Sequence, residues 1–378
     1  MSIKGTSILR ERNQKRVLEY LRKNKMSSRL EISKALKVSK NTVSLIIDHF
    51  IKQGIVAERG SKETKGAGRP SVALSIVPRS CHSVGIYTRS EKIEIIVTDY
   101  CFNIIEHSTI TITQEDRLLE ELIHCCERIV DSYPNVIGIG IGVPGLVNPK
   151  TGFVYRATNL NWTNIPLKER IQRKVNANIS VFNSVKVAAL QAIEDSEEDL
   201  HSIFYIRISE GIGGAFIINN SIHLGASWTA GEIGHISVEE NGPKCKCGQS
   251  GCLERLINVT AFKEAIKDNG FGYYNKMNIR ELINDNSSEF IMQELKNCGS
   301  YLGKAVSQVI HLLNPQVIII DSPYNGASIF KDNTVKVIEQ KSLNLPFQQT
   351  RIEFVDNVYS PAKGAAISVI INFETGES

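Results

Sequence analysis

The chain has 378 residues, of which 42% are hydrophobic and 22% are charged, and its net charge is +4. This length allows roughly two to three globular domains. No apolar run approaches the length of a membrane span; the longest, Val317–Ile320, predicts a buried strand. Because the chain has eight cysteines and no apolar secretion signal, we expect a protein of the reducing cytoplasm without a disulfide framework.

Charge is distributed unevenly along the chain. Residues 1–80 contain 18 lysines and arginines against 6 acidic residues, a balance of +12. The remainder contains 26 basic and 34 acidic residues, a balance of −8. A compact basic segment ahead of an acidic body favours a nucleic-acid-binding module joined to a second domain. We expect the first domain over residues 1–77 and the second over 78–378.

Two helices are predicted first. Apolar residues at helical spacing within Asn13–Lys25 predict one helix. Ser28 followed three residues later by Glu31 is typical of a capping box, which predicts a second helix over Arg29–Leu36. The side chains expected to be buried on this second helix are Leu30, Ile32 and Leu36, or a close variant of that set.

A third helix follows after a short turn. Ser39 is a good N-cap, and the helical pattern ends near Gln53-Gly54. Its apolar stripe consists of Val43, Ile46, Ile47 and Phe50. Polar side chains remain near its exposed amino end, where a recognition helix contacts bases in the major groove. These predicted DNA-binding residues are Lys40, Asn41, Thr42 and Ser44.

Two predicted strands, 55–58 and 71–76, flank the basic segment Arg59–Pro70. Such a hairpin tip suits phosphate contacts, and Arg69 is the candidate for entry into a narrow minor groove. Three helices and this hairpin predict a winged helix-turn-helix that binds double-stranded DNA. A small three-helix module that mediates protein contacts is the alternative.

After Pro78, strand patterns alternate with helical ones. The strand patterns cover 83–87, 92–99, 136–143, 179–182, 203–208, 215–218 and 317–321, and the longer helical patterns cover 117–133, 259–267, 288–313 and 364–371. This alternation predicts an α/β body with two lobes and a cleft.

Residues 225–254 contain four metal-ligand side chains within eighteen residues, namely His235, Cys245, Cys247 and Cys252. Three thiolates and one imidazole form a closed tetrahedral set, as in structural zinc sites. Gly248 and Gly251 allow the tight backbone turns that direct the sulfurs to one point. The alternative is that these cysteines are ordinary buried side chains. Glu232 and Glu254 lie among the ligands without being needed by the metal, which favours a polar binding surface held by zinc.

Four segments carry a family resemblance: AGEIGH and CKCGQSGCLE, with IGVPGLVNPKTGFVYRATNLNW and EGIGGAFI before them. From about Cys81 to the carboxyl end, the chain resembles the ROK family of repressors, open reading frames and sugar kinases. With a winged helix ahead of this region, it resembles the transcriptional repressor branch, which includes repressors of the xylose operon and of N-acetylglucosamine genes.

The resemblance implies an actin-like fold of the sugar-kinase type with sugar bound between two lobes. Lobe one would comprise about 78–184 plus 360–378, and lobe two about 185–359. The positions that match sugar-binding residues of the family are Asn183, Glu232, His235 and Glu254, so that His235 would serve both the metal and the sugar. Asn161 is either a further sugar ligand or a turn-forming asparagine.

Three departures from the family pattern argue against kinase activity. Ser184 replaces the aspartate that acts as base in family kinases, and a serine hydroxyl lacks basicity near neutral pH. Residues 87–91 replace the first phosphate loop with bulky and acidic side chains, and Asp321-Ser322-Pro323 replaces a glycine pair. Only the glycine-rich run 211–214 remains. We expect no catalytic residue and no bound ATP.

The sequence therefore predicts a sugar-responsive repressor of sugar-uptake or sugar-catabolism genes. We expect structural zinc as cofactor, and as partners a DNA operator, a sugar or sugar-derivative effector and a second copy of the chain, in a dimer or tetramer. An ATP-dependent sugar kinase with a fused DNA-binding head is the alternative. A zinc-dependent hydrolase is disfavoured, because a closed ligand set leaves no position for water.

Overall fold

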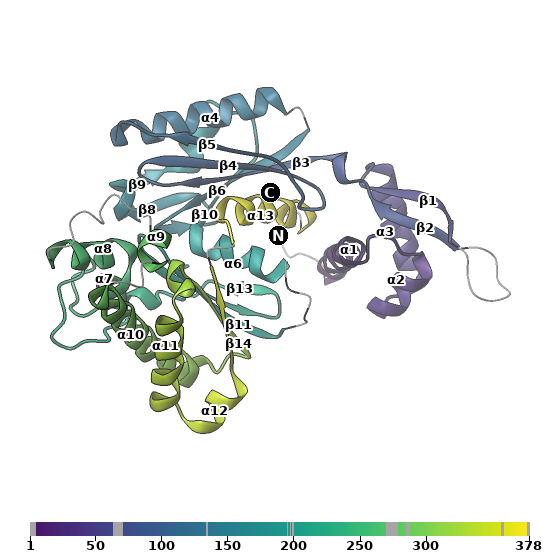
Figure 1. The fold of residues 1–378 in the computed structure, drawn as a ribbon. Helices are drawn as coiled ribbons and strands as arrows, with labels where there is room; N and C mark the ends of the chain where they lie inside the picture. Colours follow the sequence, from purple (N-terminus) through teal and green to yellow (C-terminus); the bar gives the residue numbers. More distant parts are fainter. Residues whose placement is uncertain are drawn as a thin grey trace. The chain divides into compact units, whose positions relative to one another are not determined.

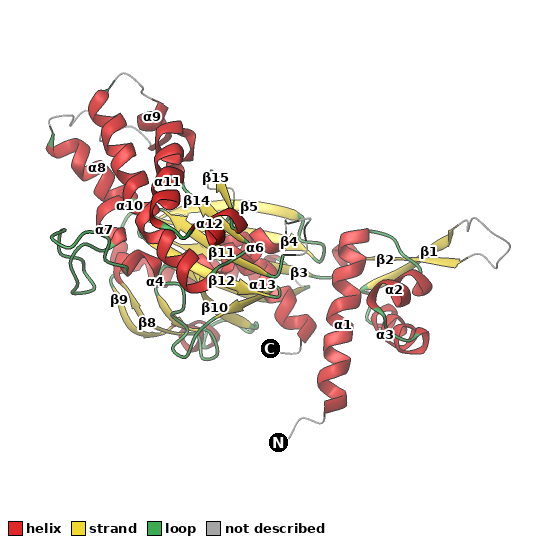
Figure 2. Ribbon diagram, turned by 90° about the horizontal axis from the view of Figure 1, so that it is seen from below, coloured by secondary structure: helices red, strands yellow, loops and turns green. Residues whose placement is uncertain are grey.

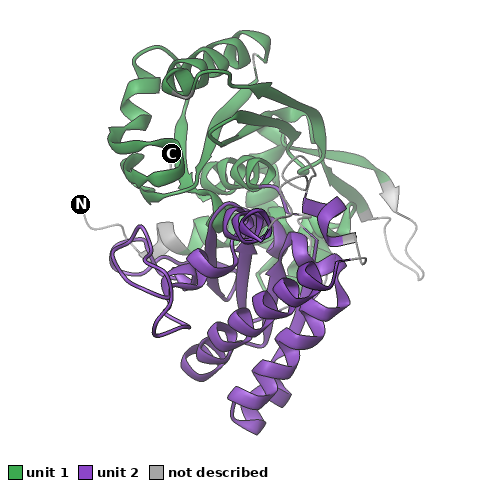
Figure 3. Ribbon diagram, turned by 60° about the vertical axis from the view of Figure 1, so that its left-hand side comes forward, with its two compact units in different colours: residues 1–187, 361–378 green, residues 188–360 purple. Residues whose placement is uncertain are grey.

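The computed structural model describes residues 5–62, 71–133, 135–194, 196, 198, 200–269, 279–284, 288–356 and 359–375. The chain forms two compact units (Figure 3). Unit 1 comprises residues 1–187 and 361–378, and unit 2 comprises residues 188–360. The amino-terminal head, residues 5–76 as far as they are described, belongs to unit 1.

The head contains three helices and a two-stranded hairpin (Figures 1 and 2). They are α1 (Gly5–Asn24), α2 (Arg29–Leu36), α3 (Lys40–Lys52), β1 (Val56–Lys62) and β2 (Ser71–Ile76). The predicted capping box is present: the Ser28 amide donates to the Glu31 carboxylate at 2.7 Å, and the Glu31 amide donates to Ser28 Oγ at 3.3 Å. Ser39 Oγ accepts a hydrogen bond from the Thr42 amide at 3.1 Å. Both helix starts are thus confirmed.

The head has its own apolar core. All four predicted stripe residues of α3 are buried, together with Val17, Leu18 and Leu21 of α1 and Ile32 of α2. Complete burial of a leucine or isoleucine side chain contributes about 1.5–3 kcal/mol. The prediction for Leu30 was wrong, because this side chain is 41% exposed. Leu30 directly follows the first helical residue and lies off the face that Ile32 turns to the core. The predicted wing tip, including Arg69, lies outside the described residues.

The rest of unit 1 is built on a five-stranded sheet of order β10-β6-β3-β4-β5. Its strands are β3 (His82–Thr88), β4 (Lys92–Asp99), β5 (Ile104–Thr111), β6 (Val136–Val143) and β10 (Ile179–Asn183). β10, β6 and β3 are parallel, whereas β4 and β5 are antiparallel neighbours. The predicted strands are present; β5 was not predicted.

Helices and a small second sheet complete unit 1. The helices are α4 (Leu118–Ser132), α5 (Leu167–Gln172), the first residues of α6 (Ser184–Glu194) and α13 (Pro361–Thr375). An antiparallel three-stranded sheet contains β7 (Leu146–Asn148), β8 (Phe153–Ala157) and β9 (Trp162–Pro166). α13 lies against the large sheet at glycines: a Cβ on Gly85 would lie 1.8 Å from Ala362 O, and one on Gly140 would lie 2.4 Å from Ala365 O. The backbones are therefore in direct contact.

Unit 2 contains a second five-stranded sheet of order β13-β12-β11-β14-β15. Its strands are β11 (Ser202–Ile208), β12 (Ile212–Ile218), β13 (Ser221–His223), β14 (Val317–Asp321) and β15 (Arg351–Val355). β11, β14 and β15 are parallel, and β12 and β13 are antiparallel. Its helices are the remainder of α6, α7 (Leu253–Ile257), α8 (Val259–Asp268), α9 (Ile279–Asn284), α10 (Glu289–Leu313), α11 (Ser328–Lys341) and α12 (Asn344–Gln349).

The predicted long helices α8 and α10 are confirmed, whereas α11, α12 and β15 were not predicted. α10 and α11 pack closely because Gly299 lacks a side chain; a Cβ there would lie 2.6 Å from Phe330 O. Among the described residues, no helix is both long and apolar enough to cross a membrane.

Candidate functional site

The segment Gly231–His235 is held against strand β12 by glycines. Gly231 has φ +92°, and a Cβ on it would lie 2.4 Å from Gly214 O. A Cβ on Gly234 would lie 2.2 Å from Ile212 O. The glycine run 211–214 therefore accommodates the close approach of this segment, and the approach fixes the backbone on which Glu232 and His235 stand.

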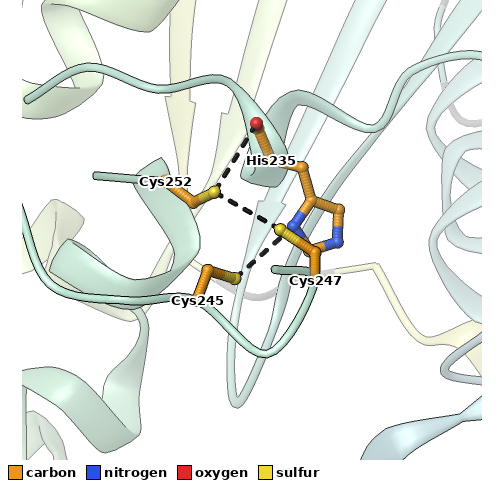
Figure 4. Close-up of side chains that lie close together, drawn as sticks. All are labelled: His235, Cys245, Cys247 and Cys252. Atoms are coloured by element: carbon orange, nitrogen blue, oxygen red, sulfur yellow. Dashed lines mark hydrogen bonds between the residues drawn. The ribbon is translucent and has the colours of Figure 1, made fainter. Parts of the chain in front are cut away.

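The four predicted metal ligands lie together (Figure 4). Their ligand atoms are all within 4.8 Å of one another. Cys247 Sγ lies 3.6 Å from Cys252 Sγ, and Cys245 Sγ lies 3.8 Å from His235 Nδ1. Ligands on a tetrahedral zinc, at about 2.0–2.3 Å from the ion, are about 3.3–3.8 Å apart. The donor set and its spacing therefore fit one tetrahedral metal ion.

The imidazole of His235 presents its two nitrogens to different surroundings. Nδ1 faces the sulfurs, while the second ring nitrogen, Nε2, lies on the side of the ring away from them (Figure 4). A ligand bound at Nδ1 leaves Nε2 as an N–H donor, since one nitrogen of a neutral imidazole carries the proton. A metal ion would thus fix both the orientation and the tautomer of this side chain.

The thiols differ in acidity. The pKa of Cys247 is lowered, chiefly by a backbone hydrogen bond from Gln249, whereas burial raises the pKa of Cys252 to about 12. A bound cation stabilises the thiolate of both residues. The loop turns tightly at Gly248 and Gly251, with φ +102° and +69°. The two glycines thus have the role that the sequence predicted.

Lys304 of α10 braces the metal-ligand loop. Its ammonium donates to Val238 O at 3.1 Å and lies 3.4 Å from a carboxylate oxygen of Glu239. Sequence reasoning missed this residue, because it lies 65 positions from Glu239 and belongs to an otherwise ordinary helix. The only signal available was a lysine within a largely apolar helical pattern.

The two acidic residues of the motif occupy different local settings. Glu254 is in the first turn of α7, and one carboxylate oxygen accepts a hydrogen bond from the Ile212 amide at 2.9 Å. Glu254 therefore joins α7 to the same glycine-rich strand that supports the Gly231–His235 segment. Glu232 immediately precedes the short helical turn Ile233–His235 and is partly buried. The Gly231–His235 segment, which carries Glu232 and His235, and the Glu254 carboxylate are thus both held against β12 of unit 2.

Asn183 lies in unit 1, at the end of β10. Its Oδ1 accepts hydrogen bonds from the amides of Val185 and Lys186 at 3.0 and 3.1 Å, and its Nδ2 donates to Gly145 O at 2.9 Å. Asn183 thus starts α6 and holds the Pro144-Gly145 turn. An amide nitrogen has two N–H donors, so one of them remains for a ligand. Asn161 has φ +54°, as expected of a turn asparagine.

The DNA-binding candidates of α3 differ in exposure. Lys40 and Asn41 are exposed, whereas Ser44 and Thr42 are partly buried and Thr42 shares the helix cap with Ser39 at 2.8 Å. Leu45 was not among the predicted contacts, yet it is 72% exposed and lies one helical turn beyond Asn41. The sequence contained a signal for Leu45, because this apolar residue falls outside the predicted apolar stripe of the helix and was therefore expected to be exposed.

Two side chains at the carboxyl end of β14 are fully buried and hydrogen-bonded. Asp321 is fully buried and accepts hydrogen bonds from Arg207 at 2.6 Å and from the Tyr205 hydroxyl at 2.5 Å. Tyr324 is also fully buried and donates its hydroxyl to Ile257 O at 3.0 Å. Both side chains are thus engaged in hydrogen bonds within unit 2.

Comparison with known proteins identifies both parts of the chain. The ROK family pattern matches residues 83–368, and a winged helix-turn-helix DNA-binding pattern matches residues 10–57. The xylose repressor of Caldicellulosiruptor bescii is 29% identical over 371 residues, covering 92% of each chain. The xylose repressor of Bacillus subtilis is 32% identical over 330 residues, covering 85% of this chain and 84% of the relative.

Among solved structures, a ROK family transcriptional regulator described as a homologue of the E. coli MLC protein superposes with a TM-score of 0.83 at 22% identity. The match covers 98% of this chain and 100% of that one. The predicted fold class is thereby confirmed: a winged helix-turn-helix precedes a domain of the actin-like, sugar-kinase type. The chain belongs to the ROK family.

Proposed function

We propose that the protein is a DNA-binding transcriptional repressor of sugar-uptake or sugar-catabolism genes and that a sugar or sugar derivative modulates its DNA binding. The observation that carries this proposal is the capped helix α3, with Lys40 and Asn41 exposed, in the same chain as a ROK domain. The relatives named xylose repressors match this chain over both parts.

The head would bind an operator in the manner of other winged helices. Lys40, Asn41, Thr42 and Ser44 would contact the major groove from the amino end of α3. Arg69 of the wing would enter the minor groove or contact phosphates. The balance of +12 over residues 1–80 supports a large electrostatic contribution, so affinity should fall steeply with salt.

The sugar ligands proposed in unit 2 are Glu232, His235 and Glu254, with Asn183 as the proposed ligand from unit 1. Carboxylate oxygens accept hydrogen bonds from sugar hydroxyls, and a neutral imidazole can donate from Nε2. Because β12 supports the three unit 2 residues, a sugar bound to them would act on the same scaffold as the metal ligands.

The metal is proposed to be zinc in a structural role. Three cysteines and one histidine supply all four positions of a tetrahedral ion, so no position remains for a catalytic water. The zinc-hydrolase alternative is therefore set aside. The ion would hold the loop 235–252 and orient His235 toward the sugar.

Catalytic inactivity is supported by the surroundings of three positions. Ser184 is buried and offers a hydroxyl where a base is needed. Arg89 N donates to Lys92 O at 2.9 Å, so residues 88–92 form a tight hairpin turn with no glycine. After β14, Asp321-Ser322-Pro323 stands where family kinases have a glycine pair, and Asp321 is fully buried. We propose that the protein binds no ATP and transfers no phosphate.

The repressor is proposed to act in the cytoplasm as a homo-oligomer, a dimer or tetramer. Two heads of a dimer would reach successive major grooves about 34 Å apart on a near-palindromic operator. A coupling of about 1–3 kcal/mol between sugar and DNA would change operator affinity about 5- to 150-fold.

Electrophoretic mobility shifts with genomic fragments, recorded with and without a panel of pentoses and hexoses, test the proposal. We expect a sequence-specific shift whose midpoint changes with one sugar. A coupled assay for ADP release across the same sugars tests the alternative of a kinase with a fused head. Robust turnover in that assay would contradict the proposal.

A further inference from the structure

A buried ion pair joins the DNA-binding head to the last helix of the chain. Arg22, near the end of α1, pairs with Glu374, near the end of α13, across 352 positions of sequence. The side chain of Arg22 is 7% exposed and that of Glu374 is 0% exposed. Charged side chains are rarely buried to this extent unless they are paired, so this contact is a built feature of unit 1.

Aromatic and apolar groups enclose the pair. The Arg22 guanidinium lies 4.3 Å from the centroid of the Phe102 ring and 5.7 Å from that of Tyr100. Tyr100 and Ile370 belong to the same apolar cluster as the core of the head. A cation over an aromatic face is attracted to the ring and shielded from water. The head therefore shares a continuous core with the body of unit 1.

The link between head and body is also fixed. The Val77 amide donates to Ile55 O at 2.8 Å, and the Tyr100 amide donates to Pro78 O at 2.9 Å. Tyr100 thus contacts the link through its backbone amide, and its ring contacts the guanidinium of Arg22. A flexible tether would leave such backbone groups to water, whereas here they are paired on both sides of Pro78.

α13, the helix that contacts the head, starts where the chain leaves unit 2. Unit 2 ends at residue 360, and α13 begins at Pro361. α13 is seated on β3 and β6 through the close contacts of Gly85 and Gly140, and Ser83 Oγ donates to Ala366 O at 2.9 Å. A helix held by backbone contacts has little freedom to shift at one end alone.

We propose that Arg22 and Glu374 are positioning residues that fix the DNA-binding head on α13. The orientation of α3, the proposed recognition helix, is then set by α13, which begins where the chain returns from unit 2 to unit 1. Neither residue is among the proposed DNA contacts of α3. The link to DNA binding rests on the proposed function, whereas the docking itself is a property of the free protein.

Hydrogen–deuterium exchange of the full-length protein tests the docking. In Glu374→Gln the carboxylate charge is lost with little change of shape, so Arg22 is left with a neutral partner. We expect amide exchange to accelerate at least about fivefold in peptides covering 99–103 and 366–375, with unit 2 peptides unchanged. The matched control is Glu264→Gln, which removes an exposed ion pair with Arg255 at 2.9 Å in unit 2.

A second experiment measures whether DNA binding at the head changes amide exchange in α13. On a DNA fragment selected by mobility shift, binding should slow exchange in 366–375 of the wild type, because linkage between the head and α13 is reciprocal. In Glu374→Gln, DNA should protect the head but leave 366–375 unchanged. A pair that only stabilises the fold would lower the melting temperature and leave this DNA-induced protection intact, which would overturn the proposal.

A milder variant covers the case in which Glu374→Gln does not fold. Arg22→Lys keeps the charge but loses the planar guanidinium, and we expect the same changes at smaller amplitude. Unchanged exchange in 99–103 and 366–375 for the folded variants would refute the docking. If wild type binds no DNA fragment, the proposed function fails, and the free-protein exchange still decides the docking.

Discussion

Replacement of one metal ligand tests how far the loop 235–252 depends on an ion. Cys247 is exposed, so Cys247→Ser should cost little through packing alone. Its sulfur lies 3.6 Å from that of Cys252, as expected for two ligands of one ion. Structural zinc in small model sites contributes about 10–16 kcal/mol. If four ligands share this equally, loss of one costs about 2.5–4 kcal/mol, or roughly 10²- to 10³-fold in metal affinity.

The assay is metal content per chain by elemental analysis, followed by competition with a chelator. Wild type should retain one zinc per chain, and Cys247→Ser should lose it at chelator concentrations roughly 10²- to 10³-fold lower. Cys101→Ser is the matched control, since Cys101 is a partly buried cysteine outside the cluster. Full metal content in Cys247→Ser under competition would refute the ligand assignment.

Two further predictions concern the sugar and the DNA. Glu232→Ala should abolish the sugar response in mobility shifts while sparing DNA binding; retained induction would remove Glu232 from the site. Asn41→Ala and Leu45→Ala should each weaken operator binding by about 1–3 kcal/mol, Leu45→Ala through the loss of an apolar contact with a thymine methyl group. Fluorescence anisotropy with the operator and with a mutated operator measures both losses. Equal losses of affinity on the two DNAs would contradict base contacts by these residues.

Local signals in the sequence predicted the head well. The starts of α2 and α3 were predicted from Ser28, Glu31 and Ser39, because helix capping depends on residues three positions apart. The error at Leu30 arose because burial depends on the angle at which a short helix meets its neighbours. An eight-residue helix gives too few turns to define that angle from its pattern alone.

In the body, buried strands were predicted and exposed ones were missed. β6 and β14 are continuous apolar runs, whereas β5 is an edge strand with most side chains exposed. β5 lacks a clear apolar pattern because most of its side chains are exposed to solvent. Its pairing with β4 could be recognised only once the position of β4 was known.

The cluster of four candidate metal ligands was predictable, because all four residues lie within one short segment. The contacts that hold these four residues in place could not be predicted. The close approach of Gly231 to Gly214, the brace from Lys304 and the hydrogen bond from Ile212 to Glu254 join segments that lie 17 to 66 positions apart. The pair of Arg22 and Glu374 spans nearly the whole chain. Such contacts depend on the tertiary fold and leave no pattern in the local sequence.

The central claim is that sugar occupancy changes DNA binding without phosphoryl transfer. The most direct measurement is the affinity of the full-length protein for a selected operator fragment, titrated with and without each sugar of a panel. We predict sequence-specific binding that one sugar shifts by at least about fivefold, in the absence of ATP. The absence of sequence-specific binding under every ligand condition would contradict the account.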